Sequence, residues 1–239
     1  MFGYYPFGFY MDPGYVLVLI TAILSMVASA RVSSTFKKFS KQSTLKGITA
    51  EQAARKILDE NGLYDVKIER VSGNLTDHYD PRSNVIRLSD TVHSSTSVAA
   101  VGVAAHEAGH AVQHATNYKP IKLRNSIVPV ANIGSMAGPY LIIIGLLLSG
   151  ATSNLLINLG IWLFAAAVLF QLVTLPVEFN ASNRAIATLQ NGMYLYEDEI
   201  PAVKKVLGAA AMTYVAAAAV SIANLLRFVL LASGRRRDD

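Results

Sequence analysis

The sequence contains no cysteine, and charged residues make up only 15% of its 239 residues. The absence of cysteine excludes disulfide bonds, cysteine-rich zinc knuckles and thiol nucleophiles, so a transition-metal site would have to use histidine and carboxylate ligands. The scarcity of charge, combined with a hydrophobic fraction of 52%, is typical of a membrane protein and not of an ordinary soluble domain.

The net charge of +5 does not indicate a nucleic-acid partner. The lysines and arginines flank hydrophobic runs, and no stretch interleaves basic with aromatic residues as a nucleic-acid-binding face would. We therefore expect the protein to associate with the lipid bilayer and not with a nucleic acid.

Long uncharged runs predict about four transmembrane helices. Residues 14–30 follow the aromatics Tyr4, Tyr5, Phe7, Phe9 and Tyr10 and precede Arg31, the reverse of a signal peptide, so this span is expected to stay as an anchor. Residues 125–177 are 53 consecutive uncharged residues, which at ~20 residues per crossing predict a hairpin of two spans joined by a turn at 150–153. Residues 206–226 predict the fourth span.

Basic residues near the span ends predict the orientation. Residues 31–124 carry basic residues at both ends, which places them in the cytoplasm by the positive-inside rule. The tail Arg235–Arg237 departs from this rule if the fourth span crosses completely. Either the tail is tolerated outside, or the last helix enters the membrane and returns.

The pattern divides the chain into five segments. They are an N-terminal membrane anchor (1–30), a cytoplasmic block (31–124), a transmembrane hairpin (125–177), a second cytoplasmic segment (178–205), and a C-terminal membrane helix with a basic tail (206–239).

The cytoplasmic block has local signals for helices and strands. Thr49 with Gln52 fits a capping box that opens a helix over 50–61, which Gly62 ends. Residues 64–71 and 84–90 alternate apolar and polar residues, which predicts two strands of a β-hairpin. A helix of about twenty residues follows from Thr96 and ends near Asn117. The predicted fold is α+β, mainly α: a multi-pass membrane protein with about four transmembrane helices and a cytoplasmic block of a short helix, a β-hairpin and a longer helix.

The helix carries His106, Glu107 and His110 in the order H-E-x-x-H. Residues four apart lie on one helix face, so both imidazoles can reach one zinc ion, with Glu107 placed to act as a base on metal-activated water. The alternative is a buried helix whose histidines are satisfied by carbonyl groups. A glutamate beside two histidines is costly in such apolar surroundings unless a cation compensates, which favours the metal site.

A catalytic zinc usually takes three protein ligands. His114 lies ~12 Å along the helix axis from His106, too far to share one ion, and is expected at the surface or behind the ligands. Gln113 and Thr116 occupy the Gly and His places of the longer H-E-x-x-H-x-x-G-x-x-H pattern. Glu178, the first charge after the hairpin, returns to the membrane face from which the chain entered. It is either the third ligand or an acid that marks the span end.

Four stretches together resemble the YugP-type family of integral-membrane neutral zinc metallopeptidases. They are LTDHYDPRSNVIRLS (75–89), SVAAVGVAAHEAGHAVQHA (97–115), VPVANIGS (128–135) and LPVEFNASNRA (175–185), and the likeness extends over essentially the whole chain. The resemblance implies a prokaryotic membrane metallopeptidase in which the cytoplasmic block 31–124 is catalytic and zincin-like, with one zinc ion on His106, His110 and Glu178, and Glu107 as catalytic base. The family pattern has an aspartate where this chain has Asn180, whose amide can accept a hydrogen bond but adds no negative charge.

A transition-state donor is also required for peptide hydrolysis. His78, Tyr79 and Arg184 are the polar candidates, and for His78 and Tyr79 the alternative is local turn structure. Strand 84–90 is expected to offer an edge to an extended substrate, such as a cytoplasmic tail or a membrane-adjacent segment.

Two other functions compete with the peptidase hypothesis. A non-catalytic membrane adaptor would use the metal only to join the helix to the hairpin, but all catalytic residue types are present. A transporter or channel would need ionisable residues within its spans, and none occurs there before Arg227.

Overall fold

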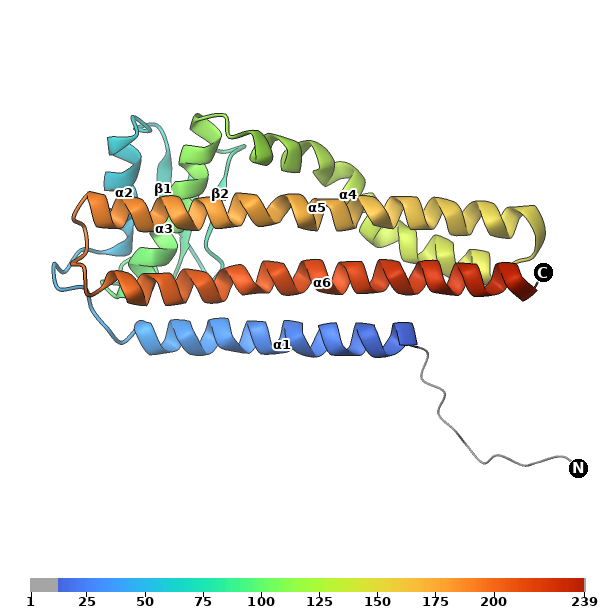
Figure 1. Cartoon of the computed structure of the whole chain (residues 1–239). Coiled ribbons are helices and arrows are strands. Elements are labelled where there is room, and N and C mark those ends of the chain that lie inside the picture. The colour runs from blue at the N-terminus through green and yellow to red at the C-terminus, as the bar shows by residue number, and fades with distance from the viewer. Residues whose placement is uncertain (1–12, 239) are drawn as a thin grey trace, which may run out of the picture. The chain divides into compact units, whose positions relative to one another are not determined.

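The computed structural model describes residues 13–238, so the aromatics predicted to precede the first span lie outside the described residues. The elements in chain order (Figure 1) are α1 (Pro13–Phe39), α2 (Ala50–Glu60), β1 (Lys67–Val71), β2 (His78–Asp80), β3 (Val85–Ser89), α3 (Val98–Ala115), α4 (Lys119–Leu147), α5 (Gly150–Asn191) and α6 (Ile200–Asp238). The predicted mainly helical α+β class is confirmed.

Four helices within the described residues are long and apolar enough to cross a membrane, as predicted. They are α1, α4, α5 and α6. The 42 residues of α5 extend ~63 Å, about twice the ~30 Å of a hydrocarbon core. The helix therefore continues beyond its apolar run, and residue 177, where the hairpin is predicted to leave the membrane, lies inside α5.

The turn between α4 and α5 differs from the prediction. The turn is formed by residues 148–149, because α5 already begins at Gly150, where a φ of +75° reverses the chain. Ser153 belongs to the helix, and its hydroxyl donates to the Gly145 carbonyl at 2.7 Å, which ties the start of α5 to the end of α4.

The C-terminal helix α6 is uninterrupted from Ile200 to Asp238. A segment that enters the membrane and returns would need a reversal of the chain, and the described part of α6 contains none.

The chain divides into two compact units. The spanning unit comprises residues 13–26, 129–169 and 216–238 of the described chain, and the site unit comprises residues 27–128 and 170–215.

Small residues let α4 and α5 approach closely within the spanning unit. A Cβ added to Gly134 would lie 1.9 Å from the Leu163 carbonyl oxygen, and one added to Gly138 would lie 3.0 Å from that of Gly160. Such contacts are the usual basis of helix association in lipid, where no hydrophobic driving force acts between helices.

In the site unit, α2 and α3 pack with the sheet around one apolar core. The capping box of Thr49 and Gln52 is present at the start of α2, and Gly62 follows the helix with a φ of +71°, both as predicted. Ile57, Leu58 and the central-strand residues Ile86 and Leu88 are fully or almost fully buried in this core. The core holds α3, which carries the H-E-x-x-H residues, against a rigid support.

The predicted β-hairpin between 64–71 and 84–90 is wrong. The sheet order is β1-β3-β2, with β1 parallel to β3 and β2 antiparallel to it. The true hairpin joins β2 to β3: Asp80 accepts hydrogen bonds from the Arg82 amide and the Ser83 hydroxyl, and Asn84 takes a left-handed φ of 56°. This turn pairs β2 with one edge of β3 and leaves the other edge to β1.

The expectation that strand 84–90 offers a free edge is therefore also wrong. β3 is the central strand, paired on both sides, and four of its five residues are buried. Among the described strands, β1 and β2 form the edges of this sheet.

Candidate metal centre

α3 positions the two histidines on one face of a buried helix. Ser97 caps its start by accepting from the Ala100 amide, and the helix ends at Ala115, before Asn117 takes a left-handed φ of 54°. Thirteen of its eighteen residues are buried, most of them alanine, glycine or valine. Because the helix is held on nearly all sides, His106 and His110 point in fixed directions one turn apart.

Glu178 reaches this face from α5. The two helices approach so closely at Gly109 that an added Cβ would lie 2.8 Å from the Ala181 carbonyl oxygen. Gln113, fully buried on α3, also donates to the Val177 carbonyl at 2.8 Å. These contacts between α3 and α5 fix the position of Glu178 relative to the two histidines.

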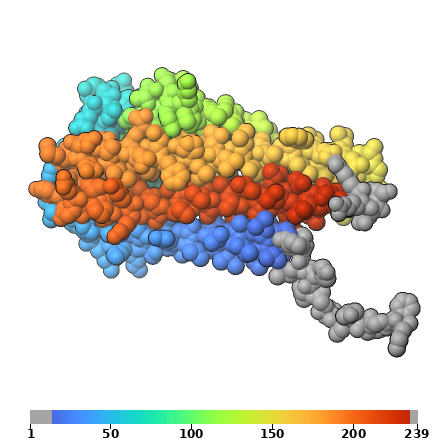
Figure 2. Space-filling view, in the orientation of Figure 1, coloured from blue at the N-terminus to red at the C-terminus, as the bar shows by residue number. Residues whose placement is uncertain are grey.

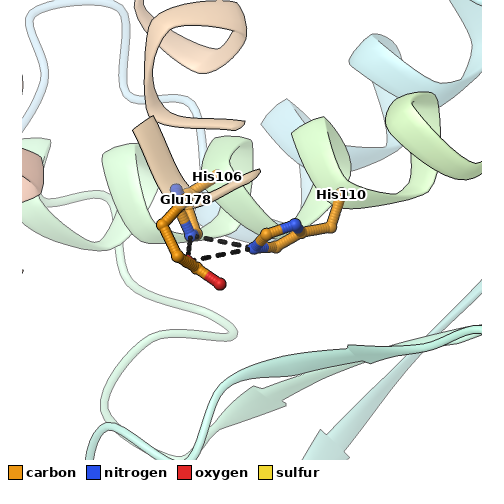
Figure 3. A group of neighbouring side chains, drawn as sticks. All are labelled: His106, His110 and Glu178. Atoms are coloured by element: carbon orange, nitrogen blue, oxygen red, sulfur yellow. Dashed lines mark hydrogen bonds and ion pairs between the residues drawn. The ribbon is translucent and has the colours of Figure 1, made fainter. Parts of the chain in front are cut away.

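The three side chains form a compact triangle of ligand atoms (Figure 3). The Nε2 atoms of His106 and His110 lie 3.1 Å apart, and Oε2 of Glu178 lies 3.3 Å from the first and 3.4 Å from the second. Ligands at ~2.0–2.1 Å from a tetrahedral zinc ion are separated by ~3.3 Å. The triangle therefore has the size that a zinc ion requires, and it is the group of three metal-ligating side chains found among the described residues.

The hydrogen bonds around the triangle direct lone pairs towards its centre. The Gln113 amide donates to Val177 and to Asn180 Oδ1, so its oxygen faces His110 Nδ1 at 3.0 Å and accepts that proton. In a neutral His110 this leaves a lone pair on Nε2. Glu178 Oε2 is buried without a hydrogen-bond partner in the described chain. A cation between these atoms would satisfy both, so the residues fit a zinc ion.

The local electrostatics also favour a cation. Burial acts to lower the pKa of His110, but the adjacent Glu178 carboxylate and the charge of Glu107 outweigh it and raise this pKa. In the metal-free protein the site thus favours the protonated, positively charged form of His110. A divalent ion would replace that proton.

Glu107 lies beside the triangle and is largely buried at 8% exposure. It lines a mainly polar cavity of about 220 Å³ together with His106, His110 and Glu178. Asp77 lines the same cavity; burial raises its pKa, the nearby Glu107 carboxylate adds to this, and hydrogen bonds from Ser89 oppose it. Because Glu107 lines the same cavity as the three ligand side chains, it is placed to exchange a proton with a molecule bound at the triangle.

Three further residues named in the sequence analysis lie near the triangle without belonging to it. His78, Tyr79 and His114 line the polar cavity, although the Tyr79 hydroxyl already donates to Asn84 Oδ1 at 3.0 Å. His114 is not in the ligand group, and its ring packs edge-to-face on Tyr79. Burial, and then the charges of His110 and Arg124, lower the pKa of His114.

Asn180 and Arg184 stand behind the ligands. Asn180 Oδ1 accepts from Gln113 Nε2 at 3.0 Å and from Arg184 Nε at 2.8 Å. The residue that orients His110 is thus Gln113, and Asn180 acts one bond further away. Arg184 is held by Asn180 and does not line the polar cavity.

The sequence did not predict several residues of the centre. They are Gln113, Ser182, Arg124, Tyr214 and, as a cavity residue, Asp77. Ser182 lies 3.1 Å from His106 Nδ1, so each histidine has a partner on its second nitrogen. The helical spacings i+3 from His110 to Gln113 and i+4 from Glu178 to Ser182 were available signals. Nothing local in the sequence indicates that Arg124 and Tyr214 border the same cavity.

The chain is similar to known sequences over nearly its whole length. A family model described as "Putative neutral zinc metallopeptidase" matches residues 14–233. The "Putative membrane protease YugP" of Bacillus subtilis (strain 168) is 50% identical over 226 residues, which cover 94% of this chain and 99% of that protein. No solved structure matches the chain.

Proposed function

Because the chain belongs to the neutral zinc metallopeptidase family, we propose that it is a membrane-bound, zinc-dependent endopeptidase. One observation carries this proposal: the ligand triangle of His106, His110 and Glu178 shares a cavity with Glu107. A purely structural metal site would be closed by four protein ligands, whereas three ligands leave a position for water or substrate.

Each residue of the centre has a proposed role. His106, His110 and Glu178 hold one zinc ion, which when bound polarises a carbonyl group and lowers the pKa of water. Glu107 takes the proton from the attacking water and delivers it to the amine nitrogen as the peptide bond breaks. No covalent bond between enzyme and substrate is formed, and the products are a carboxylate and an amine.

Gln113 and Ser182 support the ligands. By accepting the Nδ1 proton of His110, the buried Gln113 fixes the tautomer and the direction of that ring, and Ser182 contacts the corresponding atom of His106. Asn180 holds the Gln113 amide in its orientation through a neutral hydrogen bond, so it contributes position without adding charge.

Arg124 joins His78 and Tyr79 as a candidate to stabilise the oxyanion. Its Nε is buried without a hydrogen-bond partner in the described chain, and its Nη1 lies 4.0 Å from Glu178 Oε1. A guanidinium at this edge of the polar cavity can donate to an oxygen on which negative charge develops. The Tyr79 hydroxyl is already engaged with Asn84, which supports Arg124 over Tyr79.

We propose that the centre faces the cytoplasm of a prokaryotic cell and that residues 31–124 and 178–205 lie on that side. Arg31 and Lys38 of α1 and Lys204 and Lys205 of α6 line one groove of the site unit, where Figure 2 shows the two helices, blue and orange-red, side by side. Basic residues gathered at span ends favour the cytoplasmic face. Suitable substrates are then cytoplasmic tails, membrane-adjacent segments and unfolded chains.

The outer edge of β2 supports binding of an extended peptide. His78 and Tyr79 of this strand line the polar cavity, so a peptide that pairs along β2 would pass the ligand triangle.

Purified protein in detergent tests the proposal. We expect it to cleave casein, to lose this activity with a chelator, and to regain it when zinc is restored. Binding of one zinc ion without cleavage of casein or of unfolded proteins would instead support the membrane adaptor.

A further inference from the structure

A second, apolar cavity adjoins the candidate metal centre. It has a volume of about 180 Å³ and lies among α1, α3, α6 and the loop between β1 and β2. Its apolar lining includes Val32, Phe36, Leu75, Val103, Val206 and Ala210.

The two cavities share four residues. Asp77, His106, Glu107 and Tyr214 border both the polar cavity that contains the ligand triangle and the apolar cavity. A peptide whose scissile bond lies beside His106 and Glu107 would therefore have a neighbouring side chain within reach of the apolar cavity.

Leu75 has an unusual conformation at this cavity. Its φ of 55° lies in the left-handed region, which a bulky apolar residue rarely adopts, and the residue remains 39% exposed. Two residues later, Asp77 anchors the loop by accepting from the Ser89 amide at 2.7 Å and from the Ser89 hydroxyl at 3.0 Å. Strained residues that are held by their surroundings cluster at ligand-binding sites, and here the anchored loop places an apolar side chain at the cavity.

We propose that this cavity is the specificity pocket of the enzyme, and that it takes one large aliphatic or aromatic side chain adjacent to the scissile bond. The inference rests on the proposed peptidase function. It defines the substrate class as peptides with a leucine-like or phenylalanine-like residue at one fixed position next to the cleaved bond.

The size and lining of the cavity support a single side chain. Pockets that enclose a whole small molecule usually measure ~300–1,000 Å³, and this cavity is smaller. An acidic side chain would be buried among apolar groups and would be repelled by the acids Asp77 and Glu107 at the rim, and a basic side chain that fills the cavity would lose its hydration among the apolar residues that form most of the lining. An apolar side chain would instead be removed from water, which is favourable.

Two variants alter the pocket without changing a ligand or the base. Ala210→Leu adds bulk inside the cavity, and Gly208→Leu is its control, because a Cβ on Gly208 of the same helix meets no atom within 4 Å. Leu75→Gly removes the strained side chain and suits the left-handed φ, so this variant should fold even if Ala210→Leu does not.

The first measurement is the cleavage profile. Sites cut in casein are identified by mass spectrometry, and kcat/KM is then compared for paired peptides with leucine or alanine at the selected position. We expect the wild type and Gly208→Leu to prefer leucine by at least about tenfold, and Ala210→Leu and Leu75→Gly to lose most of that preference.

The second measurement is binding to the zinc-loaded Glu107→Gln protein, which keeps the pocket. Fluorescent leucine peptides should bind more tightly than alanine peptides, and addition of Ala210→Leu should remove the difference. If peptides are cleaved but neither pocket variant changes the profile, the pocket is refuted and the peptidase stands. If nothing is cleaved yet binding depends on Ala210, the peptidase function and the role in cleavage specificity are refuted, and the cavity remains only as a site that binds an apolar side chain.

Discussion

Gly109 of α3 lies directly against the backbone of Ala181 on α5, with room for no more than a hydrogen atom. An added Cβ would be 2.8 Å from the Ala181 carbonyl oxygen and 3.4 Å from its Cα. The contact fixes the distance between the helix that carries both histidines and the helix that carries Glu178. One glycine inside the H-E-x-x-H sequence thus controls the closure of the ligand triangle.

Gly109→Ala is expected to weaken zinc binding and to cost about 1–3 kcal/mol of stability, because the clash is with backbone atoms that cannot rotate away. Thermal unfolding and competition with a zinc chelator measure the two effects. Gly208→Ala is the control: its Cβ meets nothing, and replacing a helical glycine should gain about 0.5–1 kcal/mol. If Gly109→Ala loses no more stability and zinc affinity than Gly208→Ala does, the contact between Gly109 and Ala181 is not critical.

Gln113→Leu should lower zinc affinity about 10–100-fold, the usual effect of removing a hydrogen-bond partner of a ligand histidine. The variant leaves the Nδ1 proton of His110 without an acceptor. Asn180→Asp, which adds charge one bond further away, should leave the affinity unchanged or raise it. If zinc affinity in Gln113→Leu matches that of the wild type, Gln113 does not orient His110.

Zinc affinity should fall as the pH is lowered. The pKa of His110 in the metal-free protein is raised above its usual 6.5, so protons occupy this ligand at and above that pH and compete with the metal. Affinity measured by chelator competition should therefore decrease steadily from about pH 8 to about pH 6, within the range where histidine titrates. A constant affinity over this range would contradict the assignment of His110 as a ligand.

Gly134→Ala is expected to destabilise the packing of α4 on α5 in the spanning unit, because its Cβ would lie 1.9 Å from the Leu163 carbonyl oxygen. Thermal unfolding in detergent should show a lower midpoint, whereas zinc affinity of the folded protein should stay unchanged. Gly234→Ala is the control, because a Cβ there meets no atom within 4 Å. An unaltered midpoint in Gly134→Ala would mean that this contact is loose in detergent.

The parts of the structure that the sequence predicted depend on local periodicity. The spacing of His106 and His110 places both on one helix face, and long uncharged runs produce α1, α4, α5 and α6. The sequence could predict Glu178 as a third ligand because a hairpin of two spans must return the chain to the membrane face from which it entered. Its position inside α5 was not predictable in this way, because the uncharged run ends at residue 177 whereas the helix continues to Asn191.

The features that were missed depend on contacts between distant residues. β1 pairs with β3 in parallel because the turn after Asp80 recruits His78–Asp80 as a strand, which alternation over longer runs does not reveal. Gln113 looked like a failed position of another zinc motif, yet its contacts with Val177 and Asn180 make it the partner of His110. Such roles follow from packing of α3 on α5, which no local pattern encodes.

The most direct test measures zinc content and peptide hydrolysis together in Glu107→Gln, with Glu178→Ala and the exposed-acid variant Glu197→Ala for comparison. We predict one zinc ion per chain and no hydrolysis in Glu107→Gln, loss of both in Glu178→Ala, and wild-type values in Glu197→Ala. Hydrolysis at the wild-type rate by fully loaded Glu107→Gln, or full zinc content in Glu178→Ala, would contradict the proposed centre.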